Sequence, residues 1–157
     1  MYEEIYRNSI EPQNTINMLG ESIIFKERQL QLFQWLIDKA RSTPSFSPTQ
    51  AKEVITLLQF VRDEKLTHSN ILYNMYFELT NAYPPPYDRT FYPPENILSG
   101  LETAILENLE SAQKNRLIMN SLQQSSDRFL MSSIISDEIN HVDLLSYLTL
   151  YLKNLQT

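Results

Sequence analysis

Two short stretches of the chain carry the residues whose types and spacing could do chemistry. Near the C-terminus, Glu138 and His141 stand three residues apart, so they share one face of a helix. When the middle of the chain is aligned on His68, Lys65 occupies the position that Glu138 has in the other stretch. Paired Glu-x-x-His helices supply the ligands of carboxylate-bridged two-metal sites. The doubled pattern predicts a helical bundle, and the lysine predicts that its metal chemistry is lost.

Both stretches lie at the centres of matching apolar seams. In each seam, steps of three and four residues place the polar pair among six apolar residues on one helical face. The later seam consists of Met131, Ile134, Glu138, His141, Leu145, Leu148, Leu152 and Leu155. The earlier seam consists of Val54, Leu58, Val61, Lys65, His68, Leu72, Met75 and Leu79. This agreement indicates an internal repeat of helical hairpins whose polar pairs point inward.

A two-metal site also needs a carboxylate from each of the other two helices. On the third expected helix the central polar position is Asn108, a neutral amide. Glu107 and Glu110 fall off its apolar face, so we expect them to be solvated. On the first expected helix, Glu21 sits at the edge of the apolar face. By the stricter count, Glu138 alone remains of the four expected carboxylates.

The elements that must position these residues are four helices. The chain has 157 residues, only two glycines and two proline-rich interruptions, which favours one all-α domain. We expect helices at about 14–41, 48–80, 95–123 and 127–155, after a polar arm at 1–13 and with a connection at about 81–94. Short breaks make two antiparallel hairpins, and the long connection can cross the length of the bundle. An ordinary bundle with a long loop is the alternative.

Capping residues predict where two of these helices begin. Ser47 and Gln50 have the spacing of a capping box, with Pro48 at the first helical position. We expect the third helix to begin near Pro94 or at Ser99, where Ser99 and Glu102 have the same spacing. Each pair satisfies backbone N–H groups that a helix start leaves without partners.

Charge and composition argue against several classes of protein. The formal net charge is -6 and no basic run occurs, which argues against a nucleic-acid surface. Without cysteine the chain has no disulfide and no thiolate metal site. No apolar run reaches membrane-spanning length, and the polar, acidic start is not that of a signal peptide. We therefore expect a cytoplasmic protein with no nucleic-acid or membrane partner.

These residues resemble the rubrerythrin-like branch of the ferritin-like proteins, particularly small single-domain members from spore-forming bacteria. The resemblance covers roughly residues 14–155. The motifs that carry it are Asp137-Glu138-x-x-His141, the segment from His68 through Tyr76-Phe77-Glu78-Leu79-Thr80, and Gly20-Glu21. It implies a ferritin-like four-helix bundle of two antiparallel hairpins joined by a long Pro-rich crossover. Family members with an intact site bind two iron or manganese ions and react with oxygen or peroxide.

Carried over residue by residue, the resemblance also implies a set of metal ligands. These are His68, Glu138, His141 and Glu21. The chain departs from the family at Lys65, which replaces a bridging Glu, and at Asn108, which replaces a terminal Glu. Our hypothesis is that Lys65 fills the place of the missing metal. The inner polar cluster would then be Lys65, His68, Asn108, Glu138 and His141.

The leading interpretation is a non-catalytic ferritin-like protein with a degenerate metal site, no cofactor and a structural or interaction role. The resemblance implies a spore or stress setting and a homodimer or other homo-oligomer, with no protein partner predicted. The alternative is an iron- or manganese-binding protein with oxidoreductase or metal-storage activity. It would use the implied ligands and one shifted carboxylate from Glu64, Glu107 or Glu110. A small-molecule binder built around Lys65 is a third interpretation.

Overall fold

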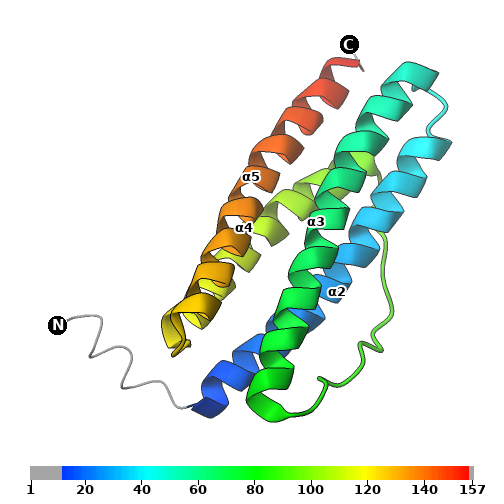
Figure 1. Cartoon of the computed structure of the whole chain (residues 1–157). Coiled ribbons are helices and arrows are strands. Elements are labelled where there is room, and N and C mark those ends of the chain that lie inside the picture. The colour runs from blue at the N-terminus through cyan, green and yellow to red at the C-terminus, as the bar shows by residue number, and fades with distance from the viewer. Residues whose placement is uncertain (1–11, 156–157) are drawn as a thin grey trace.

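The computed structural model describes residues 12–155, which form four long helices and no strand (Figure 1). The helices are α2 (Pro12–Ser42), α3 (Pro48–Thr80), α4 (Ile97–Ser121) and α5 (Ser125–Leu155). They lie side by side as a bundle, which confirms the all-α prediction. The expected polar arm, apart from its last two residues, lies outside the described residues.

The helices pair as two hairpins. α2 packs mainly on α3 and α4 packs mainly on α5, whereas between the hairpins α2 lies against α4 and α3 approaches α5 less closely. Residues 43–47 link the first pair and residues 122–124 link the second. α3 ends and α4 begins at opposite ends of the bundle, and residues 81–96 run between these ends without forming a helix (Figure 1). Part of this connection lies against α2 and α4, where Tyr87 and Phe91 line a pocket with Leu32.

One predicted capping box is confirmed and the other is wrong. The Gln50 backbone N–H donates to the Ser47 hydroxyl at 3.2 Å, and the Ser47 N–H donates to the Gln50 side chain at 2.8 Å. At α4 the N-cap is Asn96, whose side chain accepts from the Ser99 N–H at 2.9 Å. Ser99 is therefore the third helical residue and not the cap, so it does not pair with Glu102. The extended backbone of Asn96 lets an amide cap the helix soon after the prolines end.

The helix ends follow from local backbone geometry. α3 ends where Asn81 adopts the left-handed conformation with φ 54°, which Asn tolerates better than most residues. α4 ends earlier than expected because Leu122 is extended, and α5 begins at Ser125, two residues before the expected start. Both seams stay buried except at their C-terminal ends, where Leu79 and Leu155 are exposed.

The interior has three layers along the bundle. The large apolar cluster lies at the end that holds the α2–α3 link, and it consists of Leu32, Phe33, Leu36, Ile37, Ala40, Val54, Leu58, Val61, Ile97, Leu101, Ala104, Leu145, Leu148 and Leu152. The small apolar cluster lies at the other end, and it consists of Leu19, Ile23, Leu72, Met75, Ile118, Leu122, Met131 and Ile134. Between them lies a buried polar layer to which all four helices contribute. The apolar clusters therefore fix the helices that position the polar side chains.

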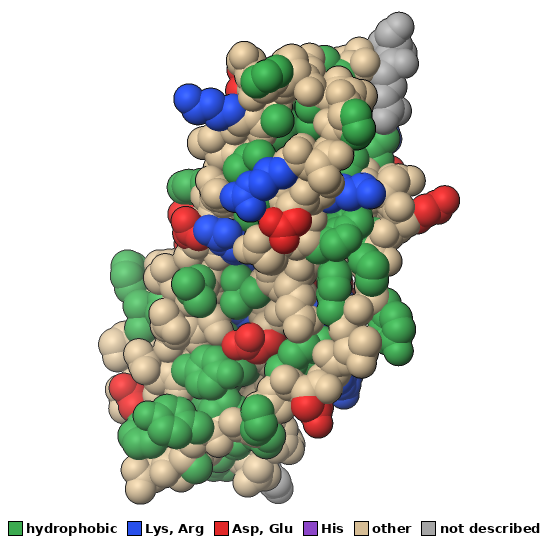
Figure 2. Space-filling view, turned by 90° about the vertical axis from the view of Figure 1, so that its right-hand side faces the viewer, with side chains coloured by type: hydrophobic (Ala, Val, Ile, Leu, Met, Phe, Trp, Pro, Cys, Tyr) green, Lys and Arg blue, Asp and Glu red, His purple; other side chains and the backbone are tan. Residues whose placement is uncertain are grey.

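The surface is mixed in character. On the face shown in Figure 2, Lys, Arg, Asp and Glu side chains lie among one another and among apolar groups. Within residues 12–155, no helix combines the length and the apolar character that crossing a membrane requires. The polar layer lies beneath this surface, in the interior of the bundle.

Candidate functional site

Two lysines share a single carboxylate at the centre of the polar layer. Glu138 on α5, Lys26 on α2 and Lys65 on α3 are each 0% exposed. The Lys26 ammonium donates to Oε1 of Glu138, and the Lys65 ammonium donates to Oε2 at 2.9 Å. Lys65 and Glu138, which we expected in one inner cluster, form an ion pair, and the sequence analysis missed the second cation, Lys26.

Neutral side chains accept the remaining hydrogen bonds of the two ammonium groups. Lys65 Nζ donates to Oδ1 of Asn108 at 2.7 Å and lies 3.5 Å from Oε1 of Gln29. Lys26 Nζ donates to the hydroxyl of Ser111 at 3.3 Å. The amide nitrogen of Asn108 donates in turn to the backbone carbonyl of Ala104 at 2.6 Å. Asn108 therefore points inward as predicted, and its amide oxygen accepts a hydrogen bond from Lys65.

The two histidines pair reciprocally with acids of the opposite stretch. Nε2 of His68 lies 2.9 Å from a carboxylate oxygen of Asp137, and Nε2 of His141 lies 2.7 Å from one of Glu64. Each acid immediately precedes the inward charged residue of its own stretch. The two imidazole rings are stacked, with centroids 6.0 Å apart. α3 and α5, whose backbones approach each other less closely than those within each hairpin, are therefore joined through two His–carboxylate pairs.

The inner nitrogen of each histidine has no hydrogen-bond partner. Nδ1 is buried in both His68 and His141, and that of His68 lies 3.7 Å from Oε1 of Glu138, which is beyond hydrogen-bond distance. Burial, together with the nearby Lys65 cation, lowers the pKa of His141 to about 3. His141 is therefore neutral at physiological pH, and it donates its Nε2 proton to Glu64.

Burial and charge act in opposite directions on the central triad. Burial, followed by repulsion from Lys26, lowers the pKa of Lys65 to about 7, although Glu138 opposes that shift. Burial by itself would raise the pKa of Glu138, but Lys26 and Lys65 together hold that pKa well below its usual range. The carboxylate is therefore charged, and Lys65 is poised between its charged and neutral forms near pH 7.

The donor set does not fit a pair of iron or manganese ions. Two ammonium groups already occupy both oxygens of Glu138 and would repel any metal cation beside them. Both His Nε2 atoms are engaged by acids at the edge of the layer. Across residues 12–155, no group of three or more His, Cys, Asp or Glu side chains is arranged to hold a metal ion. The chemistry of the layer is that of a buried ion-pair network.

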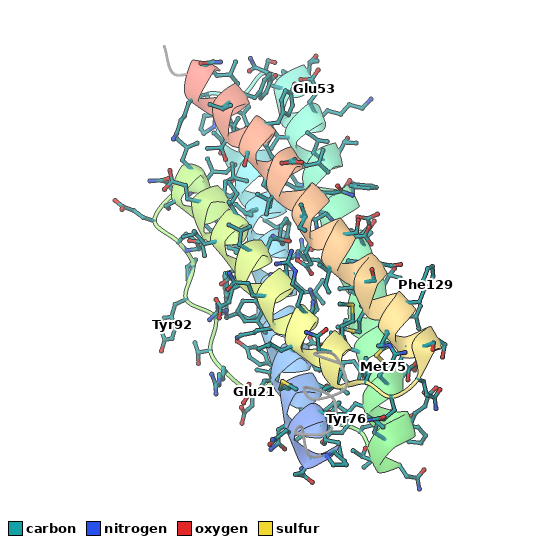
Figure 3. All side chains as sticks on the ribbon, turned by 90° about the vertical axis from the view of Figure 1, so that its left-hand side faces the viewer. Glu21, Glu53, Met75, Tyr76, Tyr92 and Phe129 are labelled. Carbon is teal, nitrogen blue, oxygen red and sulfur yellow. The ribbon has the colours of Figure 1, made fainter. Side chains whose placement is uncertain are left out.

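Two acidic residues lie elsewhere than the sequence analysis placed them. Glu21, an implied ligand, is exposed on the outside of α2 and does not reach the polar layer (Figure 3). Glu107, which we expected to be solvated, is buried and forms an ion pair with Arg28. Burial raises the pKa of Glu107, and Arg28 partly offsets that effect. An arginine from α2 covers this carboxylate, which the pattern of α4 by itself does not reveal.

The spacing of Lys26 in the sequence indicates an inward position, although its charge argues for an exposed one. Lys26 follows Ser22 by four residues and precedes Gln29 by three, and both of those residues lie on the inward face of α2. Phe25, the neighbour of Lys26 in sequence, is also buried, because a core-facing stripe is wide enough to bury both residues. Lysine is almost never fully buried unless it is paired, so the partner had to be known first.

Comparison with known proteins finds no match for the chain. No protein-family model matches it, and neither a curated protein nor a solved structure is significantly similar to it. The chemistry of the polar layer is therefore defined by its own contacts. Those contacts offer two buried amines, one shared carboxylate, one carboxamide and two imidazoles.

Proposed function

We propose that the chain is a ferritin-like bundle of the rubrerythrin-like kind whose metal centre has been replaced by lysines. Two hairpins, a long connection along the bundle and a doubled acid–His stretch at one level support this proposal. The protein then has a structural or interaction role, without catalysis and without a cofactor. A spore or stress setting and self-association as a homodimer or other homo-oligomer belong to the same proposal.

The observation that carries the proposal is the position of the two ammonium groups. Each holds one oxygen of Glu138, the one acidic side chain at the centre of the layer. In a two-metal centre, divalent cations offset the charge of the surrounding carboxylates. Here Lys26 and Lys65 supply that positive charge from within the chain. The hypothesis that a lysine fills the place of a metal is thus extended to two lysines.

This arrangement suits a scaffold. Both lysines belong to the first hairpin and Glu138 belongs to the second, so the ion pairs connect the two halves. A buried charge without its partner is strongly destabilising, which favours the one packing that keeps all three groups together. The polar layer then specifies how the hairpins dock, and the function of the protein resides on its surface.

Metal analysis tests the proposal directly. The purified full chain would be incubated with ferrous or manganous ions, desalted and analysed for bound metal. We expect no stoichiometric metal. The variant Lys26→Glu/Lys65→Glu removes both cations and places three carboxylates beside the two histidines, so we expect it to gain bound metal. The matched control Lys39→Glu/Lys52→Glu makes the same change at exposed positions and should gain none.

The wild-type result decides the matter even if the core variant fails to fold. Close to two metal ions per wild-type chain would overturn the proposal and restore an iron- or manganese-dependent oxidoreductase or a metal store. One ion per chain would also overturn it, because the lysine pair leaves no charge for a metal to balance.

A further inference from the structure

An amine, a carboxamide and a carboxylate meet in the polar layer without access to water. Nζ of Lys65 lies 2.7 Å from Oδ1 of Asn108 and 2.9 Å from Oε2 of Glu138. All three side chains are 0% exposed, and the ring of Phe33 covers the same nitrogen at 5.6 Å. These three groups are the reactants and the proton carrier that an amide exchange requires.

We propose that Lys65 and Asn108 join in an intramolecular isopeptide bond, with Glu138 carrying the proton. The product is a covalent link from α3 to α4, between positions 43 residues apart in sequence. It would tie the first hairpin to the second across the long connection. This modification site goes beyond the proposed scaffold role, and it does not depend on whether the chain is ferritin-like.

The reaction balances without any further reactant. The Lys65 ammonium gives one proton to the Glu138 carboxylate, and the resulting amine attacks Cγ of Asn108. A C–N bond forms, and the bond from Cγ to Nδ2 breaks. The departing nitrogen takes the proton held by Glu138 and a second proton from the attacking nitrogen, so it leaves as ammonium. Glu138 returns to its carboxylate form, and no group is oxidised or reduced.

The geometry brings the reacting atoms close before any motion occurs. Because a C=O bond is about 1.23 Å long, the 2.7 Å contact places Nζ no more than about 3.9 Å from Cγ. The long Lys65 side chain reaches across the bundle from α3 to Asn108 on α4, and the fold holds the two groups together, which replaces a bimolecular encounter. The amide plane must turn so that its face meets Nζ, which releases the bond from Nδ2 to the Ala104 carbonyl.

The protonation states also suit the reaction. Burial and the nearby Lys26 lower the pKa of Lys65 to about 7, so a neutral amine is accessible at physiological pH. Lys26 and Lys65 hold the pKa of Glu138 well below its usual range, so a carboxylate is ready to accept the proton. Low water access protects the tetrahedral carbon from hydrolysis.

The charge count favours the product. Before the reaction, two buried ammonium groups face one buried carboxylate. Afterwards Lys65 is part of a neutral amide, and Lys26 pairs alone with Glu138. The reaction therefore removes the excess buried cation, whose confinement is costly. Lys26 also serves as an internal comparison, because its neutral neighbour is the hydroxyl of Ser111 and offers no carboxamide to attack.

Mass spectrometry of the full chain tests the bond. After incubation at mildly alkaline pH, we expect the intact protein to be lighter than its sequence by one ammonia. Trypsin should cut after the exposed Arg89 but not after Lys65, so that peptides 63–89 and 90–114 stay joined. Protein kept unfolded in urea should retain its full mass, because the reactants then separate.

Two variants locate the chemistry. Glu138→Gln keeps both reactants but loses the proton carrier, so its mass should not change. Asn108→Asp should lose water in place of ammonia and reach the same final mass as linked wild-type protein. An unchanged wild-type mass after prolonged incubation overturns the proposal, whether or not the variants fold. Loss of ammonia with separable peptides also overturns it, because that result indicates a succinimide within one segment.

Discussion

The polar layer and the two apolar clusters beside it are buried to the same degree, but they are stabilised in different ways. In the apolar clusters, each side chain contributes through the area that it removes from water, whichever apolar neighbour covers it. In the polar layer, Glu138 is acceptable only because lysine cations pair with it. Substitutions should therefore be graded in the clusters and strongly dependent on partners in the layer.

The difference also separates stability from specificity. Apolar surfaces allow neighbouring registers of similar energy, since many pairings bury similar area. The layer allows one register, because a shift of either hairpin would leave a buried ion without its partner. The polar layer thus contributes more to selecting the register in which the two hairpins pack than to the overall free energy of folding.

The largest effect should come from Glu138→Gln. The substitution keeps the shape of the side chain but leaves two buried ammonium groups without an anion. We expect a loss of about 3–5 kcal/mol in the free energy of unfolding, measured by urea denaturation against protein whose mass shows no internal bond. Leu148→Ala, in the large apolar cluster, serves as the comparison at about 2–5 kcal/mol.

Removal of one lysine charge separates these two variants further. In Glu138→Gln, the loss should shrink when Lys26 is also changed to Met, because one of the unpaired cations is then removed. The same Lys26→Met change should leave the loss in Leu148→Ala unaltered, since the two sites have no partner in common. Equal responses in both backgrounds would contradict the division between layer and clusters.

The two glycines of the chain probe how tightly the apolar ends are packed. A Cβ on Gly100 would lie 2.7 Å from Trp35 and 2.8 Å from Leu36, so Gly100→Ala should destabilise the protein by about 1–3 kcal/mol. A Cβ on Gly20 would lie 3.6 Å from its nearest neighbour, Tyr76, which is an ordinary contact. Gly20→Ala should therefore stabilise α2 by up to about 1 kcal/mol. Thermal denaturation of both variants checks the signs, which should be opposite.

The apolar clusters could be predicted from the sequence because their signal is periodic. Steps of three and four residues identified the inward faces of α3 and α5, including the level of Lys65 and Glu138. The same reasoning predicted that Asn108 lies at the centre of α4. These results need only the geometry of one helix at a time.

The remaining features depend on contacts between helices, which periodicity does not contain. Lys26 becomes tolerable only beside Glu138, and Glu107 becomes buried only beneath Arg28. The crossed pairing of His68 with Asp137 likewise depends on how α3 meets α5. Polar residues therefore conceal their burial in a sequence, because their partners come from other elements.

A smaller effect should be seen in the pH dependence of stability. The pKa of His141 is lowered to about 3, so the unfolded chain binds more protons than the folded one between about pH 3 and 6.5. Stability from this group is therefore lost as the pH falls through that window. Between pH 6.5 and 5 the expected loss is about 1.5 kcal/mol.

The variant His141→Gln isolates that contribution, because Gln can still donate to Glu64 but does not titrate. Its stability should vary less between pH 6.5 and 5 than that of wild type, measured by urea denaturation at each pH. Burial raises the pKa values of Glu64 and Glu107, which act in the opposite direction and remain in both proteins. An identical slope in the variant would show that His141 does not carry the effect.

The smallest effect should come from removing one lysine. In Lys26→Met protein whose mass shows no internal bond, Lys65 still pairs with Glu138, and the excess buried cation is replaced by an apolar chain of similar length. We expect a change of less than about 1 kcal/mol in the free energy of unfolding, or a gain. In Lys26→Met/Lys65→Met the carboxylate has no cation, so the loss should approach that of Glu138→Gln. A large loss of stability in Lys26→Met would mean that both lysines are required. Glu138 would then need a cation at each of its two oxygens, as a carboxylate that bridges two metal ions does.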